Sequence, residues 1–138
     1  MKKIETVETA AQAAAMFRAA LPEKQKEERV FVLPLDGGGK ALAKPILVSV
    51  GHKDGTATID AGAIFREALK AGAEEIIVAH NHPSGDLTPS KADIAATTKL
   101  REAADLLSVP LIDHIILGRG GAFRSLAEPS GDMIDGME

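Results

Sequence analysis

The run Glu75-Ile76-Ile77-Val78-Ala79 decides the fold. A short apolar stretch of this kind is typical of a strand that is buried on both faces in the middle of a sheet. A helix is expected before it, over about residues 61–71, because the apolar residues of that segment fall on one helical face and a glycine follows its end. A second helix is expected after it, over about residues 89–107, with Thr88 as the N-cap and Pro89 in the first helical position.

Farther from this centre, the chain reads as one more helix and several short strands. Residues 6–20 are rich in Ala and Glu, with Thr6 as the predicted N-cap of a helix that ends before Pro22. Pro34 and Pro45 fall inside two of the expected strands and indicate a sheet edge or a bulge there. The expected strands lie over residues 30–35, 42–50, 57–59, 111–117 and 122–126, with turns at 36–39 and 118–121.

Strands and helices alternate through the middle of the chain, whereas two hairpins add antiparallel strands. The helix over about residues 61–71 is long enough to be a crossover between strands. These features predict an α/β sandwich with a mixed β-sheet flanked by helices. We expect an N-terminal helix and linker over residues 1–26, a folded domain over 27–127 and an acidic, flexible tail over 128–138.

The 138-residue chain fits one domain, which at this size buries roughly two-thirds of the surface that its unfolded form exposes. It has no run of about 18 apolar residues, so no membrane-spanning segment is expected. The residues Met1-Lys2-Lys3-Ile4-Glu5 lack the apolar core of a signal peptide, and a cytoplasmic location is expected by default.

Composition excludes several kinds of site. The chain has no cysteine, which excludes disulfides, thiolate metal sites and a cysteine nucleophile, so a metal site must use His, Asp, Glu or water. Its net charge is −4, and it has no Trp or Tyr and only four Phe. Nucleic-acid binding relies on basic residues that neutralise phosphates and on aromatic residues that stack on bases. The net negative charge and the few aromatic residues support neither, so we do not expect nucleic acid as a partner.

The segment from His80 to Asp93 carries the chemistry. Side chains alternate in an extended chain, so His80 and His82 leave the end of the central strand on the same side, where two imidazoles can reach one ion. A Pro-Ser-Gly turn then leads to a helix N-terminus. Ser90 and Asp93 are three residues apart on one face of that helix, so the turn brings a hydroxyl and a carboxylate back towards the histidines.

Two neutral histidines and one carboxylate form a known catalytic zinc set, which leaves the fourth tetrahedral position to water. Zinc lowers the pKa of that water to about 7, which supplies hydroxide near neutral pH. We therefore expect His80, His82 and Asp93 to bind one Zn²⁺, while Mn²⁺ and Fe²⁺ suit the same ligands.

Hydrolysis also needs a base that takes a proton from the water and passes it to the leaving group. Glu28, just before the first predicted strand, is the leading candidate. Spacing alone does not separate it from Glu27, Glu74 or Glu75.

The pattern of His80-x-His82, seven residues, Ser90, two residues and Asp93 resembles the JAMM motif of the JAB/MPN metalloprotease superfamily. Three longer stretches resemble its RadC-like branch: Glu28-Arg29-Val30-Phe31-Val32-Leu33-Pro34-Leu35-Asp36, His80-Asn81-His82-Pro83-Ser84-Gly85 and Leu111-Ile112-Asp113-His114-Ile115-Ile116-Leu117-Gly118. The resemblance covers about residues 27–127 and implies a metal-binding domain with a cytidine-deaminase-like α/β fold.

By this resemblance, Glu28 matches the upstream glutamate that acts as general base, and Ser90 matches the serine that stabilises the oxyanion of a tetrahedral intermediate. The implied activity is that of a zinc-dependent metallopeptidase or isopeptidase. Its peptide or isopeptide substrate is not encoded in the sequence. The alternatives are a non-catalytic metal-binding scaffold with the same ligands, and a DNA-associated protein of the DNA repair type traditionally linked to the RadC name.

The chain departs from the RadC-like pattern outside the ligand set. Residues 1–26 are too short for the helix-hairpin-helix module that often precedes the domain, so we expect a stand-alone form. Ala61-Gly62-Ala63 stands where Pro-Arg-Glu is frequent, and His52 stands where Ser or Thr is frequent. These changes affect expected substrate contacts and leave the metal ligands untouched.

We expect structural roles for the remaining polar residues. Asp113 and His114 are expected to form a buried, hydrogen-bonded pair in preference to acting directly in catalysis. Asn81 is expected to brace the turn that follows it, and His52 to lie in a surface loop. The Ala-rich first helix is expected to cover an edge or a face of the sheet, with a homodimer seam on its small residues as the alternative.

Overall fold

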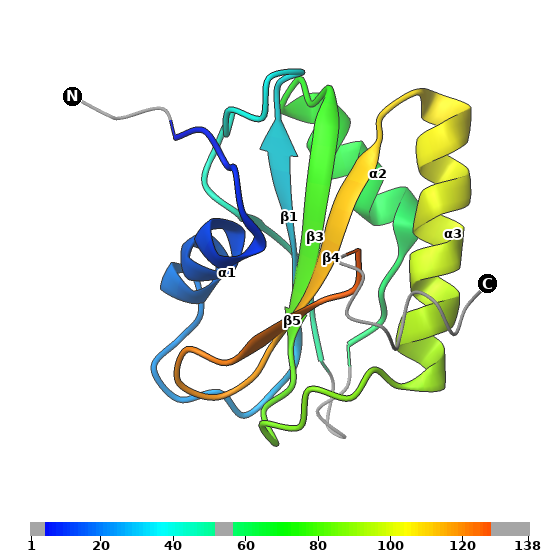
Figure 1. Ribbon diagram of the computed structural model, residues 1–138. Helices are drawn as coiled ribbons and strands as arrows, with labels where there is room; N and C mark the ends of the chain where they lie inside the picture. Colours follow the sequence, from blue (N-terminus) through cyan, green and yellow to red (C-terminus); the bar gives the residue numbers. More distant parts are fainter. Residues whose placement is uncertain (1–4, 52–56, 128–138) are drawn as a thin grey trace.

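The centre of the protein is a five-stranded mixed β-sheet (Figure 1). The computed structural model describes residues 5–51 and 57–127. The strand order is β2-β1-β3-β4-β5; β3 is antiparallel to β1 and parallel to β4, and the two outer pairs are antiparallel. The strands are β1 Arg29–Leu35, β2 Ile46–Val50, β3 Glu75–Asn81, β4 Leu111–Leu117 and β5 Phe123–Ser125.

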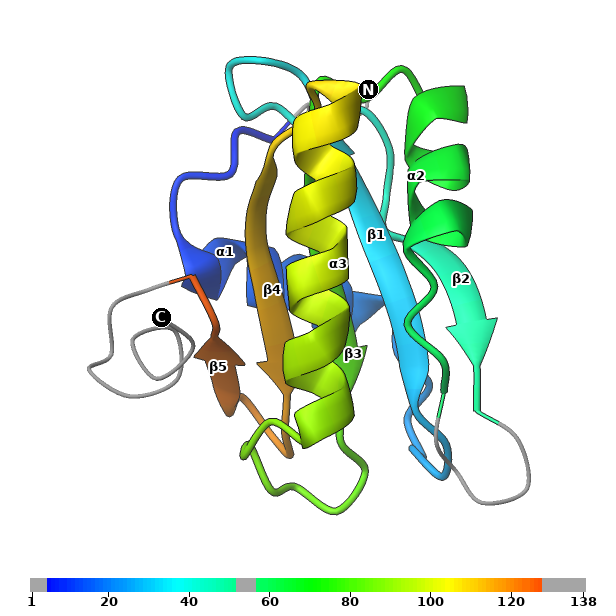
Figure 2. The same cartoon turned by 90° about the vertical axis from the view of Figure 1, so that its right-hand side faces the viewer.

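Three helices cover the two faces of this sheet. Helix α1, Ala10–Ala19, packs on one face, and α2, Ala61–Lys70, lies with α3, Lys91–Leu107, on the other (Figures 1 and 2). The result is a sandwich with the sheet between two helical layers. The predicted α/β sandwich with a mixed sheet is therefore confirmed.

Strand β3 divides its side chains between two hydrophobic cores. Ile76 and Val78 belong to the core beneath α2 and α3, whereas Ile77 and Ala79 belong to the core beneath α1. This alternation follows from the pleat of an extended chain. The predicted burial of the central strand on both faces is confirmed, and the even-numbered side extends to His80, which meets α3 at the end of the strand.

Helix α1 begins three residues later than the sequence pattern predicted, so Thr6 is wrong as its N-cap. Thr9 is the cap: its hydroxyl accepts from the Gln12 N–H, and the Gln12 side chain accepts from the Thr9 N–H. Thr6 has no such partner three residues on and instead forms a β-bridge with Lys40. The helix covers a face of the sheet as expected, because its small residues and Phe17 are buried against β3 and β4.

Helix α3 also begins later than predicted. Thr88 and Pro89 precede it, and Ser90 is the N-cap. The Ser90 hydroxyl accepts from the Asp93 N–H at 3.0 Å, while the Asp93 carboxylate accepts from the Ser90 N–H at 2.9 Å. This reciprocal capping box satisfies two of the backbone donors at the start of the helix.

The first hairpin is shorter than the sequence suggested. Strand β2 begins at Ile46, so Pro45 lies outside it, and β2 pairs with β1 only as far as Val32. The bulge in this pair falls between Val30 and Phe31, away from Pro34, which lies in an inner strand. The prediction is therefore wrong for Pro34, whereas Pro45 directly precedes β2, which is an edge strand of the sheet as predicted.

The short strand predicted over residues 57–59 is also absent from the described part of the chain. Those residues run beside β2, where the Ser49 hydroxyl donates to the Thr58 carbonyl at 2.9 Å. The helix after them, the two C-terminal strands and the turn between them follow the prediction closely. No helix formed by residues 5–51 or 57–127 has the length and apolar character needed to cross a membrane. The predictions for His52 and for residues 128–138 lie outside the described residues.

Candidate metal centre

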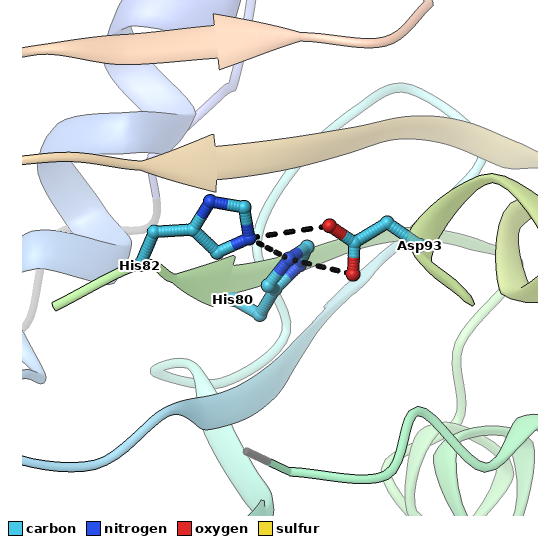
Figure 3. A group of neighbouring side chains, drawn as sticks. All are labelled: His80, His82 and Asp93. Carbon is cyan, nitrogen blue, oxygen red and sulfur yellow. Dashed lines mark hydrogen bonds and ion pairs between the residues drawn. The ribbon is translucent and has the colours of Figure 1, made fainter. Parts of the chain in front are cut away.

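The candidate site lies where β3 ends and α3 begins. In a strand–helix–strand unit the helix starts at the carboxyl end of the first strand, so residues from both elements meet there. His80 is the residue before the last in β3, His82 follows β3 directly, and Asp93 is in the first turn of α3. Figure 3 shows the two imidazoles and the carboxylate pointing toward one another. The sequence prediction that these three side chains converge is confirmed.

Three potential ligand atoms converge within a small volume. The Nε2 atoms of His80 and His82 lie 3.0 Å apart. His80 Nε2 is 3.3 Å from Asp93 Oδ1, and His82 Nε2 is 3.2 Å from Asp93 Oδ2. All the ligand atoms of the cluster lie within 4.8 Å of one another. Two imidazole nitrogens and one carboxylate so close together can hold a single divalent metal ion.

Two of the three candidate ligands, His82 and Asp93, are also held by hydrogen bonds outside the cluster. His82 Nδ1 lies 2.7 Å from the Asp86 carbonyl oxygen, which can only accept, so this ring nitrogen carries a proton and donates it. That leaves Nε2 of a neutral His82 with its lone pair toward the cluster. Asp93 is oriented by the capping box of α3. Outer contacts of this kind fix the ring orientation and tautomer of metal-binding histidines.

The electrostatics of the cluster favour a cation. Burial raises the pKa of the Asp93 carboxyl, but the hydrogen bonds from His80 and His82 outweigh burial and hold this pKa well below its usual value. The hydrogen bond to Asp93 raises the pKa of His82, against the opposing effect of burial. An ionised carboxylate beside two imidazoles is a donor set that suits Zn²⁺, Mn²⁺ or Fe²⁺.

Two members of the cluster, His82 and Asp93, line an open pocket, and Glu28 and Ser90 line the same pocket. Its other lining residues come from the approach to β1, from Ala57 and from the turn after β3. The full lining is Lys26, Glu28, Ala57, His82, Pro83, Ser84, Asp86, Ser90, Ala92 and Asp93. Two of the three candidate ligands and both predicted catalytic residues therefore face the same solvent-accessible pocket.

Strand pairing explains the position of Glu28. Val30 of β1 faces His80 of β3 in an antiparallel register, so the chain two residues earlier runs beside His82. The Glu28 carboxylate contributes to the raised pKa of His82, and its Oε1 accepts from the Ala57 N–H at 3.3 Å. This geometry brings Glu28 into the site, as the resemblance implied.

The competing glutamates lie elsewhere. Glu27 is next to Glu28 but is not among the lining residues, and its carboxylate is 4.0 Å from Arg29. Glu74 accepts from the Gly37 N–H at the opposite end of the sheet, and Glu75 begins β3 there. The fold therefore separates four candidates that spacing could not separate.

Asn81 holds the segment that carries Glu28. The Arg29 N–H donates to Asn81 Oδ1 at 2.6 Å. Asn81 Nδ2 donates to Gln25 Oε1 at 3.0 Å and to the Glu27 carbonyl at 3.2 Å. The prediction that this residue braces the turn after it is therefore wrong, because an odd-numbered side chain of β3 points to the other face, where the approach to β1 passes.

The prediction that Asp113 and His114 are buried and hydrogen-bonded is confirmed, although their side chains serve different neighbours. Asp113 accepts from the Ser125 hydroxyl at 2.6 Å and from the His114 backbone N–H at 2.7 Å. The His114 ring is fully buried and touches His80 and Thr97. Burial lowers the pKa of His114 well below its usual value, so the ring is neutral. Sequence reasoning missed Thr97, whose only signal is its spacing of four from Asp93.

The RadC-like JAB domain family matches residues 7–131. A UPF0758 protein of Carboxydothermus hydrogenoformans is 44% identical over 104 residues, which cover 75% of this chain and 45% of that protein. A UPF0758 protein of Thermosynechococcus vestitus is 40% identical over 125 residues, which cover 88% of this chain and 47% of that protein. For a UPF0758 protein of Actinobacillus pleuropneumoniae the values are 41% over 107 residues, 78% and 47%.

The chain spans less than half the length of these relatives. The family match nonetheless extends from before α1 to beyond β5, and so includes the whole sandwich and every residue of the ligand cluster. The chain therefore belongs to the RadC-like JAB domain family.

Proposed function

We propose that this chain is a zinc-dependent amide hydrolase, a metallopeptidase or isopeptidase of the JAMM type. The observation that carries the proposal is the convergence of His80, His82 and Asp93 beside an accessible pocket that His82, Asp93 and Glu28 line. A divalent ion in that cluster would supply Lewis acidity and an activated water. Family membership supports the same chemistry, while the substrate and the metal are part of the proposal.

The polar residues of the pocket have complementary roles in this proposal. Glu28 is partly exposed and beside His82, so its carboxylate can accept a proton from a water in the pocket and deliver it to the leaving amine. The Ser90 hydroxyl oxygen accepts from the Asp93 N–H, which leaves its own proton for the carbonyl oxygen of a substrate. A donor at that position stabilises the oxyanion that forms during amide hydrolysis.

The test uses two neighbouring glutamates as a matched pair. Wild type, Glu28→Gln and Glu27→Gln would be assayed for zinc content and for cleavage of a mixed set of fluorogenic peptides and lysine-linked isopeptides. We expect all three to hold zinc, and Glu28→Gln alone to lose cleavage by about a hundredfold or more, the range typical of a general base.

Two results would count against the proposal. Full cleavage by Glu28→Gln would show that the base is another group. Stoichiometric zinc with no cleavage of any peptide or isopeptide by wild type would favour the non-catalytic scaffold instead.

A further inference from the structure

A chain of buried hydrogen bonds lies behind the ligand cluster and joins two of its members. His80 Nδ1 is 2.9 Å from His114 Nε2, and His114 Nδ1 is 2.6 Å from Thr97 Oγ1. Thr97 Oγ1 in turn lies 2.9 Å from the backbone carbonyl oxygen of Asp93. None of these four residues is more than 6% exposed. The contacts therefore form one closed path from His80 through the interior back to Asp93.

The last link fixes the direction of the whole path. A carbonyl oxygen can only accept, so the single hydroxyl proton of Thr97 is donated to Asp93. Thr97 must then accept from His114, which places the proton of that ring on Nδ1. A neutral imidazole has one N–H, so His114 Nε2 is an acceptor and receives the proton of His80 Nδ1.

This direction decides which nitrogen of His80 is free. With its proton on Nδ1, a neutral His80 keeps the lone pair of Nε2 for the cluster that it shares with Asp93. The opposite direction would put the proton on Nε2, where it would block metal coordination. It would also leave the oxygens of Thr97 and Asp93 2.9 Å apart with no proton between them.

We propose that His114 and Thr97 are positioning residues that hold His80 in the one tautomer able to bind a metal ion. Each histidine ligand is then set by a backbone carbonyl: His82 directly by Asp86, and His80 through two side chains by Asp93. This inference rests on the proposed function insofar as the cluster holds a metal. Neither residue lines the pocket, so both act through the ligand residues that they contact, His80 and Asp93.

The first test separates the Thr97 hydroxyl from the Thr97 packing. Thr97→Val keeps the shape of the side chain and removes the hydroxyl, whereas Thr97→Ser keeps the hydroxyl and removes a methyl group. The affinity for Zn²⁺ alone would be measured by competition with a chromophoric chelator. We expect Thr97→Val to weaken zinc binding by about tenfold or more, in the range found for outer contacts of metal ligands, and Thr97→Ser to stay within about threefold of wild type.

The second test needs no variant, so it is independent of folding defects. Long-range imidazole ¹H–¹⁵N spectra of the metal-free wild type report which ring nitrogen carries the proton, and the chain has only four histidines to assign. We expect a proton on Nδ1 of both His80 and His114, whether or not Nε2 of His80 also carries one that it donates to Asp93. An Nε2–H tautomer at His114, or wild-type zinc affinity in Thr97→Val, would overturn the inference.

These outcomes are distinguishable from failure of the proposed function. A wild-type protein that binds no zinc would contradict the hydrolase proposal. The tautomers in the metal-free protein would still show whether His114 and Thr97 orient His80. A protein that binds zinc but cleaves nothing would sink only the hydrolase, and the Thr97 series would decide the role of the buried path.

Discussion

Asp93 belongs to two structures at once, the capping box of α3 and the ligand cluster. The cap holds the carboxylate in place before any ion arrives, and the two histidines keep it ionised. A ligand that is oriented in advance loses less conformational freedom on binding. The sequence showed this residue through its spacing from the histidines, and the structure adds that the helix start and the site share one side chain.

The Asp93→Asn substitution tests that double role. We expect zinc affinity to fall by more than about a hundredfold, beyond the loss caused by removing an outer contact, because the amide removes the negative charge of the cluster. The matched control is Asp105→Asn, which changes an exposed carboxyl on the same helix. Chelator competition on both variants checks the prediction, and an equal effect at the two positions would refute it.

The raised pKa of His82 predicts how zinc affinity depends on pH. Metal coordination requires the neutral ring, so a proton must leave His82 when the ion binds. Affinity should therefore rise by about tenfold per pH unit below the pKa of His82 and level off above it. The stability of the metal-free fold has the opposite dependence on pH. The His82–Asp93 pair stabilises the fold below the unfolded pKa of His82, and this contribution is lost as pH rises through the folded pKa of His82.

Chelator competition across about pH 5 to 8, the range in which histidines titrate, checks the first part. In Asp93→Asn the levelling point should move to lower pH, because Asp93 is the main cause of the raised pKa. A zinc affinity that stays flat over the whole range would contradict this account.

The residues of the site differ in how far the sequence could reveal them. His80, His82 and Asp93 follow from alternation in a strand and from spacing along a helix. Glu28 needed the family resemblance, because its position depends on pairing between two strands distant in the sequence, in which Arg29 meets Asn81, 52 residues along the chain. The path through His114 and Thr97 depends on contacts between ring nitrogens, which no local pattern encodes.

At the level of elements, the turn between β3 and α3 depends on Gly85. Its φ is +88°, a left-handed conformation that is strained for other residues, and an added Cβ would lie 3.1 Å from the Arg119 side chain. We expect Gly85→Ala to lower the free energy of unfolding by about 1 kcal/mol or more. It should also weaken zinc binding, because the same turn carries the Asp86 carbonyl that orients His82.

Gly121→Ala is the control for this substitution, since a Cβ there would have nothing within 4 Å. Chemical denaturation of both variants measures the difference. Equal stability of the two would show that the turn relaxes without cost.

The starts of α1 and α3 show why element boundaries were less predictable than the elements themselves. Each start offers two candidate caps a few residues apart, and in both helices the observed cap is the one followed three residues later by a Gln or Asp side chain that accepts from the N–H of the cap residue. The reciprocal hydrogen bonds outweigh the preference for proline in the first helical position. Recognition of both capping boxes would have placed both starts correctly.

At the scale of the whole molecule, the hydrophobic core beneath α1 and the ligand cluster lie on opposite faces of the sheet, so a change in that core should affect stability and not zinc binding. Phe17 of α1 is fully buried in the core beneath that helix, and its ring centroid lies 6.3 Å from that of Phe31. The ligand cluster lies on the other face of the sheet, with α3. We expect Phe17→Ala to lower the free energy of unfolding by about 3 kcal/mol or more, and to leave the zinc affinity of the folded protein within about twofold of wild type.

Leu106→Ala is the matched surface control, because Leu106 is 87% exposed and should contribute little. Denaturation followed by chelator competition below the unfolding transition separates the two effects. A large loss of zinc affinity in Phe17→Ala under folding conditions would show that the two faces are coupled through the sheet.

The fold class was predictable because buried strands and amphipathic helices leave strong periodic signals, and these occupy most of the described chain. The order β2-β1-β3-β4-β5 was not, since pairing between distant strands leaves no local pattern. The strand expected over residues 57–59 was wrong although these residues run beside the edge strand β2, where the hydrogen bond between Ser49 and Thr58 uses a side chain and not a backbone ladder.

Elemental analysis of zinc in wild type and His82→Ala, both purified without chelators, tests the central claim most directly. We predict about one zinc ion per wild-type chain and none retained by the variant, because His82 supplies one of the three ligands of the cluster. A wild-type protein that holds no zinc after zinc is supplied, or a variant that holds as much as wild type, would contradict the metal centre and the hydrolase proposal that depends on it.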